Sequence, residues 1–211
     1  MTQDYSAVEA LFTRADGQFL FARWGRPIVP VVFGVEDATI SVLKGAIEAV
    51  VTLADHKMAE TDPELGANLM VFFIRDWDEL PPTPGLDRLI PDLEPLVARL
   101  QAADANQYRS FRFDEAGGIK AAFVFIRMDD AMSEVPAETI ALSQIVQTIL
   151  LWSDTAFLGA SPLAVLEGGA AVLRPEIADI IRAAYDPVLP VAATDASFAL
   201  RLAARIGQSA H

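Results

Sequence analysis

The chain is organised around one stretch that reads Pro136-Ala-Glu-Thr-Ile-Ala-Leu-Ser-Gln-Ile-Val-Gln-Thr-Ile-Leu-Leu-Trp152. It predicts one long helix, because Pro136 suits the first turn and Glu138 lies near the positive end of the helix dipole. Apolar side chains occupy two sides of that helix, which is typical of a helix inside a larger core. We therefore expect residues 136–152 to form a mostly buried central helix.

A narrow polar stripe interrupts the apolar pattern. Ser143 and Gln147 are four residues apart and share a helix face, with Gln144 beside them. Either these side chains line a cleft that binds a peptide or small ligand, or they form a solvated or internally hydrogen-bonded stripe, the commoner arrangement on an amphipathic helix. Asp154, just after the stretch, belongs to the site in the first interpretation and is a turn or cap residue in the second. The predicted binding residues are Ser143, Gln144, Gln147 and Asp154, and we assign no catalytic residue, metal ligand or cofactor.

Composition limits the classes of protein and partner. At 211 residues the chain suits a single domain, 1–211, in which residues 1–22 form an N-terminal extension or an extra strand. Sixteen Lys and Arg against 29 Asp and Glu give a net charge of -13, which repels the phosphate backbone and makes nucleic acid an unexpected partner. The absence of cysteine excludes disulfides, thiolate metal sites and a cysteine nucleophile. A mean hydropathy of +0.32 indicates that some apolar surface stays exposed in the folded chain, and such surface often forms the interface of a homo-oligomer.

No stretch predicts a signal peptide or a membrane span. The first residues lack a basic region followed by an apolar run, and the longest apolar stretches fall short of the ~20 residues that a span needs. The default expectation is a cytoplasmic bacterial protein. A periplasmic or secreted protein whose leader had been removed would look the same.

The order of predicted elements favours an α+β fold. Strands are expected at 28–33, where Pro30 requires an edge position or later pairing, and at 68–74, an apolar run typical of a central strand. Residues 108–113 and 119–126 flank a Gly-Gly turn and predict a hairpin. Helices are expected at about 37–56, at 86–103 as one helix or two short ones, at 175–185, and from a cap at Thr194 to Gly207. The prediction is one domain with a mixed, twisted sheet of four or five strands, a long central helix and two C-terminal helices.

This order resembles the zincin fold in its metzincin-type arrangement. The resemblance rests on Trp24, on Asn68 at the start of a strand, on the hairpin and on the central helix, and it covers roughly residues 20–205. The chain is also similar to an uncharacterised proteobacterial family, some of whose members look like secreted lipoproteins, in which Gln144-Ile-Val-Gln147 and Ser153-Asp154 match a degenerate central-helix motif. In zincins the central helix carries HExxH, in which two His bind zinc and the Glu acts as general base.

This chain departs from that motif at every chemical position. Ser143-Gln144-x-x-Gln147 stands in place of His-Glu-x-x-His, and serine and glutamine are poor zinc ligands at this spacing. Neutral Gln144 cannot take a proton from water. The only histidines are His56 and His211, both far from the helix in sequence. The resemblance therefore implies a zincin-like scaffold without its metal, an inactive peptidase homologue.

Two classes of function remain. The first is a non-catalytic protein that binds a peptide or protein partner by strand addition, with the 107–127 hairpin as the exposed edge. The second is a metal-independent or carboxylate-based hydrolase that uses Asp129, Asp130 and Asp154, which requires at least two of them in one pocket with raised pKa values. The acidic run before the central helix is otherwise a solvated group of charges at a helix N-terminus. We expect the first class.

Overall fold

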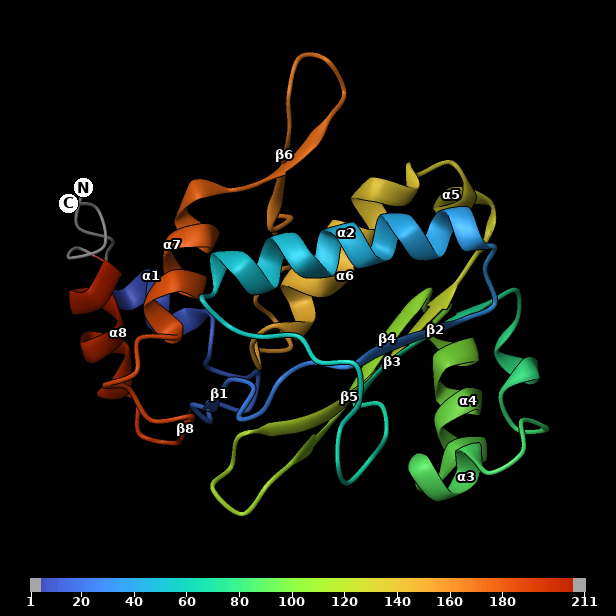
Figure 1. Ribbon diagram of the computed structural model, residues 1–211, viewed down its shortest axis with the longest axis horizontal. Coiled ribbons are helices and arrows are strands. Elements are labelled where there is room, and N and C mark those ends of the chain that lie inside the picture. The colour runs from blue at the N-terminus through green and yellow to red at the C-terminus, as the bar shows by residue number, and fades with distance from the viewer. Residues whose placement is uncertain (1–4, 207–211) are drawn as a thin grey trace.

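The computed structural model describes residues 5–206, which form an α+β fold with helices on both faces of a central sheet (Figure 1). The helices are α1 (Tyr5–Ala10), α2 (Asp37–Leu53), α3 (Leu86–Leu89), α4 (Leu93–Ala102), α5 (Asp130–Ser133), α6 (Ala137–Thr148), α7 (Pro175–Ala184) and α8 (Phe198–Ile206), with a short 3-10 turn, η1, at Trp77–Glu79. The strands are β1 (Phe21–Ala22), β2 (Pro30–Phe33), β3 (Leu69–Ile74), β4 (Gln107–Phe113), β5 (Ile119–Arg127), β6 (Leu163–Val165), β7 (Ala171–Leu173) and β8 (Ala192–Ala193).

The main sheet is mixed and has four strands in the order β2-β3-β5-β4. β2, β3 and β5 are parallel, whereas β4 pairs antiparallel with β5 through the predicted hairpin. The prediction of a central strand at 68–74 is confirmed, because β3 has neighbours on both sides. Pro30 begins β2 at one edge of the sheet, as its missing N–H requires.

Each face of the sheet covers its own hydrophobic core. β5 shows this most clearly, because Ala122, Val124 and Ile126 face the core that contains α2, α6, α7 and α8, while Phe123 and Phe125 face the core under α3 and α4. A strand buried on both faces reads as a continuous apolar run, which is why no alternation is visible in 119–126. The larger core lies on the α6 side.

The N-terminal segment is built into this larger core. Val8 on α1 and Phe12 after it are fully buried, and Phe12 stacks on Trp152 with ring centroids 5.3 Å apart. β1 adds an extra strand, although its partner is β8 in a separate two-stranded sheet. Residues 5–22 are thus a structural part of the fold rather than a free extension.

The central helix is shorter than predicted. α6 ends at Thr148 instead of continuing to Trp152, because the following residues bond to other segments. The indole Nε1 of Trp24 donates to the Thr148 carbonyl at 2.9 Å, and the Tyr185 hydroxyl donates to the Ile149 carbonyl at 2.8 Å. The Leu151 N–H then donates to the carbonyl of Ala22 at 2.8 Å. Helix carbonyls taken by side chains end the helix, and the chain turns toward β1.

The other predicted helices are present in the structure, with small differences at their ends. The helix expected at 37–56 ends at Leu53, and Glu36 rather than Asp37 or Thr39 occupies the N-cap position. The segment 86–103 forms two short helices, which was one of the two alternatives. Thr194 does not cap α8, whose first turn is entered through Asp195, and Gly207 lies outside the described residues.

One buried polar cluster fixes the start of β3, and we call it the Asp62 cluster: Arg26, Asp62 and Asn68. Asn68 is fully buried; its Oδ1 accepts from the Val29 N–H at 2.7 Å, and its Nδ2 donates to Asp62 Oδ2 at 3.1 Å. Burial by itself would raise the pKa of Asp62, but hydrogen bonds from the backbone N–H groups of residues 64 and 65, from Asn68 and from Arg26 outweigh it and lower the pKa to about 2. Each charge in this cluster therefore has an opposite charge or a hydrogen bond.

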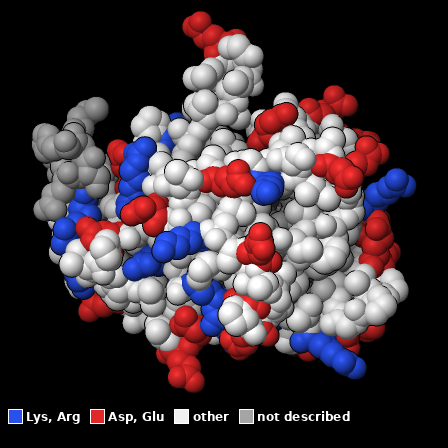
Figure 2. Space-filling view, in the orientation of Figure 1, with Lys and Arg blue, Asp and Glu red and all other residues white. Residues whose placement is uncertain are grey.

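Charged side chains of both signs are scattered over the face shown in Figure 2, with uncharged surface between them. The β6–β7 hairpin stands out from the rest of the molecule (Figures 1 and 2). None of the helices in residues 5–206 is long and apolar enough to cross a bilayer.

Candidate functional site

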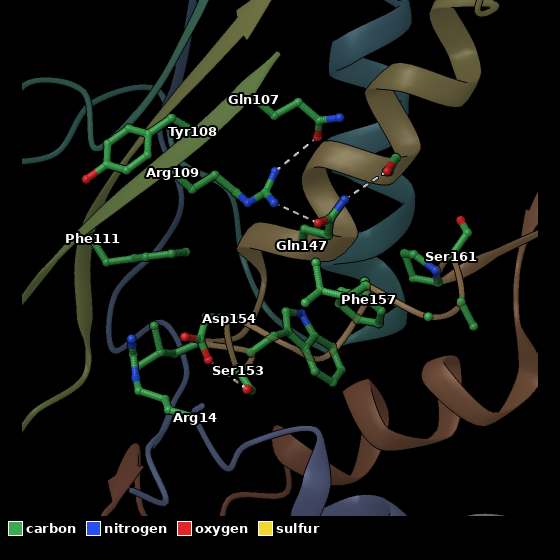
Figure 3. Close-up of a pocket in the computed structure, with 17 residues that line it drawn as sticks. Arg14, Gln107, Tyr108, Arg109, Phe111, Gln147, Ser153, Asp154, Phe157 and Ser161 are labelled. Carbon is green, nitrogen blue, oxygen red and sulfur yellow. Dashed lines mark hydrogen bonds between the residues drawn. The ribbon is translucent and has the colours of Figure 1, made fainter. Parts of the chain in front are cut away.

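A cleft of about 650 Å³ lies between the β4 edge of the sheet, α6 and the loop that follows α6 (Figure 3). One wall comes from the α6-facing side of β4 and a second from the polar stripe of α6. The third is the loop from Leu151 to Pro162. The lining residues that matter below are Arg14, Arg109, Phe111, Ser143, Gln147, Trp152, Asp154, Phe157 and Leu158.

The polar stripe of α6 holds an arginine from β4, and we call this group the Arg109 cluster: Arg109, Gln144 and Gln147. Arg109 Nη1 donates to Gln144 Oε1 at 2.9 Å, and Nη2 donates to Gln147 Oε1 at 2.8 Å. A longer contact of 3.4 Å joins Nη1 to Gln107 Oε1 on the same strand. Figure 3 shows Arg109 reaching from β4 to Gln147 across the top of the cleft. The guanidinium is thus held in one orientation by two helix residues.

The amide groups are oriented so that their oxygens face the guanidinium. Gln147 Nε2 donates to Ser143 Oγ at 2.9 Å, and Gln144 Nε2 donates to Gln107 Oε1 at 2.7 Å. An amide offers one acceptor oxygen and two donor hydrogens, so a donor bound elsewhere leaves the oxygen free for a cation. The stripe is therefore an internally hydrogen-bonded network that is completed by an arginine.

The Arg109 charge has no carboxylate partner within residues 5–206. Its side chain is partly buried, and burial lowers its pKa to about 10. Amide oxygens supply partial negative charge only, so the cation remains uncompensated in a poorly solvated position. By contrast Arg26, Arg127, Arg174 and Arg182 all pair with Asp or Glu.

Asp154 lies on the opposite side of the cleft and is occupied by local contacts. Its Oδ1 accepts from the Ala15 N–H at 3.0 Å, and Ser153 Oγ lies 3.2 Å from the same oxygen. The hydrogen bond from Ala15 lowers the pKa of Asp154, and the charge of the nearby Arg14 lowers it further. The cleft is therefore lined by two arginines and one aspartate, a net charge of +1 in a chain whose net charge is -13.

The loop wall is fastened to the N-terminal segment. The Ser153 N–H donates to the Leu11 carbonyl at 2.8 Å, and Ser153 Oγ donates to the Thr13 carbonyl at 2.7 Å. Trp152 packs edge-to-face on Phe157 with ring centroids 5.2 Å apart. Leu158, next along the loop, is 81% exposed, so apolar surface is available at the mouth of the cleft.

β4 leaves one edge of its backbone open along this cleft. The Arg127 N–H donates to the Asn106 carbonyl, and hydrogen-bonded pairs alternate along an antiparallel ladder, so the even-numbered residues of β4 bond to β5. No strand in the described chain pairs with the other side of β4. The residues whose N–H groups point to this open edge are Gln107, Arg109 and Phe111.

The open edge ends at the turn side of the hairpin. Arg112 Nη1 donates to the Phe111 carbonyl at 3.0 Å, and the register shifts between Arg112 and Phe113. A bulge and a charged side chain are features that discourage further strand pairing. The part of the edge that can accept another strand is therefore Gln107 to Phe111, beside the cleft.

The structure brings three of the four predicted site residues into the cleft lining: Ser143, Gln147 and Asp154. Gln144 is only 1% exposed and lies behind them, in contact with Arg109. Sequence reasoning missed Arg109 and Arg14. The one available signal was that Arg109 alternates with Phe111 in a strand of the hairpin, which places it on the same, inward side.

The acidic residues of the alternative function lie elsewhere. Asp129 caps α5 by accepting from the Met132 N–H at 2.8 Å and also pairs with Arg127. Neither Asp129 nor Asp130 lines the cleft with Asp154. Within residues 5–206 no group of three or more His, Cys, Asp or Glu side chains could hold a metal ion.

Comparisons of the chain with protein-family models, with curated proteins and with solved structures find no match.

Proposed function

We propose that the protein is a non-catalytic, zincin-like scaffold that binds an extended peptide segment along β4. The observation that carries the proposal is the open edge from Gln107 to Phe111, which runs beside a cleft of about 650 Å³. A bound strand would add main-chain hydrogen bonds to this edge, and its side chains would enter the cleft. This mode of binding needs neither a metal nor a catalytic residue.

The arrangement of elements supports the zincin-like part of the proposal. An antiparallel edge strand, β4, lies beside the central helix α6, and α2 packs against α6 on the same face of the sheet. The resemblance implies this combination of a mixed sheet, an edge strand that aligns a peptide, and a central helix that faces it. The proposal therefore rests on strand order and on the position of α6, independently of any catalytic motif.

The residues on α6 do not fit a zinc ion. Ser143, Gln144 and Gln147 offer no imidazole, thiolate or carboxylate, and two of their oxygens already accept from Arg109. A guanidinium at that point also repels a second cation. We therefore derive no hydrolytic step through a metal.

The carboxylate-based alternative is less well supported. It requires two carboxyl groups in one pocket with raised pKa values, whereas the cleft contains only Asp154 from its set, and hydrogen bonding lowers the pKa of that residue. Asp154 also fixes the backbone at Ala15. A structural role at the cleft wall accounts for its contacts.

The proposal is tested by titrating isotope-labelled protein with pools of random decapeptides that are acetylated and amidated at their ends. We expect binding pools to shift the backbone amide signals of Gln107, Arg109 and Phe111 and to slow their hydrogen exchange about tenfold or more, because these N–H groups gain partners. The amides of Tyr108 and Ser110 serve as an internal control, since they already bond to β5. If peptides bind while the three edge amides exchange at the free rate, strand addition is wrong.

Self-association is a second proposal, favoured by the protruding β6–β7 hairpin. Val165 and Leu166 near its tip are 72% and 53% exposed, and Leu158 at the cleft mouth is also exposed. Light scattering coupled to size-exclusion chromatography should then give more than one copy per particle. The double variant Val165→Lys, Leu166→Lys should then be a monomer. Weak dimers form at concentrations of roughly 100 micromolar, so a wild-type protein that is still a monomer at that concentration would exclude self-association through this hairpin.

A further inference from the structure

We propose that the Arg109 guanidinium binds a carboxylate group of the peptide in the cleft. The inference rests on the proposed function, because it names the chemistry that the β4 cleft selects. Its starting point is the uncompensated charge: the Arg109 side chain is withdrawn from solvent and contacts only amide oxygens. A buried or partly buried cation without an anion is unfavourable, and a ligand that supplies the anion removes that penalty.

The hydrogen bonds of the cluster leave donors free. A guanidinium carries five N–H donors, and the contacts to the three glutamines use two on Nη1 and one on Nη2. The donors without a partner in the described chain are the N–H of Nε and the second N–H of Nη2. Nε and Nη2 are neighbouring nitrogens on one side of the guanidinium, and a carboxylate can bind to that side through both of its oxygens.

Arg109 lies on the lining of the cleft, with Arg14 and Asp154 on the opposite side (Figure 3). Asp154 cannot serve as the missing anion, because its contacts are with Ala15, Ser153 and the charge of Arg14. The surplus positive charge is thus confined to the cleft of an otherwise acidic protein. An acidic peptide is repelled by the protein as a whole and attracted at this one point, which makes the position of its carboxylate selective.

The apolar part of the cleft lining indicates which side chains of the peptide accompany the carboxylate. Phe111 lies two residues along β4 from Arg109, and Phe157 and Leu158 form the facing wall. A peptide that places a carboxylate on Arg109 therefore places neighbouring side chains against aromatic and aliphatic surface. The class is an extended peptide with a carboxylate beside apolar residues, where the carboxylate is a C-terminal group or an Asp or Glu side chain.

Three matched peptide pools distinguish the sources of the carboxylate. The first contains decapeptides without Asp or Glu, blocked at both ends; the second adds one Glu at a random position; the third has a free C-terminal carboxylate and no Asp or Glu. Charge-assisted hydrogen bonds contribute enough to give about 10- to 100-fold tighter binding for the second or the third pool than for the first. Whichever pool gains affinity identifies the source.

Two variants connect that gain to Arg109. Arg109→Met removes the cation, and Gln147→Glu compensates its charge with a carboxylate of the protein in place of an amide, so both should abolish the preference for acidic pools. Arg88→Met is the matched control, because Arg88 is exposed on α3 and belongs neither to the cleft lining nor to the open edge of β4. It should keep the full preference.

The experiment separates this inference from the proposed function. If all three pools protect the edge amides of β4 equally, the carboxylate inference is wrong and peptide binding stands. If acidic peptides bind and lose affinity in Arg109→Met without protecting the edge amides, the cleft is an anion site and strand addition is wrong. If no pool binds, both are wrong.

A structural role for Arg109 gives a different result. An inward-pointing charge on an edge strand also prevents pairing between copies of a protein. If Arg109→Met keeps the preference for acidic pools but self-associates, the arginine protects the edge and the carboxylate inference is overturned.

Discussion

The Asp62 cluster and the Arg109 cluster each contain an arginine and an amide side chain, but the arginine pairs with carboxylates in the first cluster and with amide oxygens alone in the second. In the first, Arg26 meets the carboxylates of Asp62 and Glu64, and Asn68 bonds to the backbone on both sides. In the second, Arg109 meets two glutamines and no carboxylate. A buried polar cluster stabilises a fold when all its charges and hydrogen-bonding groups have partners, whereas a charge without a counter-charge at a cleft indicates a place for a ligand.

The largest expected effect comes from Asn68. Asn68→Ala leaves the Val29 N–H, the Pro27 carbonyl and one Asp62 contact without a buried partner, so we expect the free energy of unfolding to fall by about 3 to 5 kcal/mol. Urea unfolding followed by circular dichroism measures the change. Asn106→Ala is the control, because Asn106 is partly exposed, and it should cost less than about 1 kcal/mol. Equal losses in both variants would contradict the role of the Asp62 cluster.

The same substitution in both clusters tests the comparison directly. Arg26→Met should lower the free energy of unfolding by about 1 to 3 kcal/mol, because the buried carboxylate of Asp62 loses its cation, whereas Glu64 keeps its ion pair with Lys120. Arg109→Met should stay within about 1 kcal/mol of wild type, since relief of the buried charge offsets the loss of a donor to Gln144 Oε1. A larger loss at Arg109 than at Arg26 would reverse our assignment of the two clusters.

Acid sensitivity should come from Asp62. Because its pKa is lowered in the folded protein to about 2, its contribution is complete above the unfolded value of 3.8 and is lost as the pH falls through about 2. The contribution is on the order of 2 kcal/mol. Unfolding of wild type and Asp62→Asn between pH 6 and pH 2 should give a stability difference that narrows as the pH falls. A difference that stays constant over this range would show that the carboxylate charge is unimportant.

The smallest expected effect is an increase in stability. Gln147→Glu gives Arg109 a carboxylate in place of an amide, so we expect the free energy of unfolding at pH 7 to rise by about 1 kcal/mol. The gain should disappear as the pH falls below about 4, because the introduced Glu becomes protonated. Glu138→Gln, at the first turn of the same helix, changes the charge in the opposite direction as a control. A loss of stability in Gln147→Glu would mean that the Arg109 charge is already compensated.

The elements that depend on local sequence were predictable. The apolar run at Leu69–Ile74 and the Gly-Gly turn between β4 and β5 determine strand type and hairpin pairing through contacts between near neighbours. The end of α6 was not predictable, because the groups that stop it, Trp24 and Tyr185, lie more than 30 residues away in sequence.

The candidate site also has one part that the sequence predicted and one part that it did not. Periodicity on α6 placed Ser143, Gln144 and Gln147 on one polar stripe, and the helix shows that stripe. Their partner Arg109 is 35 residues from Gln144 and belongs to a strand, so no helical spacing connects them. A polar stripe in a sequence reveals which side chains are available, whereas the tertiary fold decides which charge they meet.

The pairing of β1 with β8 has a consequence for synthesis of the chain. Phe21 pairs with Ala193, so β1 is made 172 residues before its partner. At the usual rates of translation this delay is roughly 10 to 30 s. The Asp62 cluster can close as soon as residue 68 has emerged, whereas the cleft wall, in which Ser153 bonds to Leu11, must wait for a much later part of the chain. The cleft is therefore complete only after residue 162 has been made, although before α7, β8 and α8, and the N-terminal segment cannot form its final contacts until then.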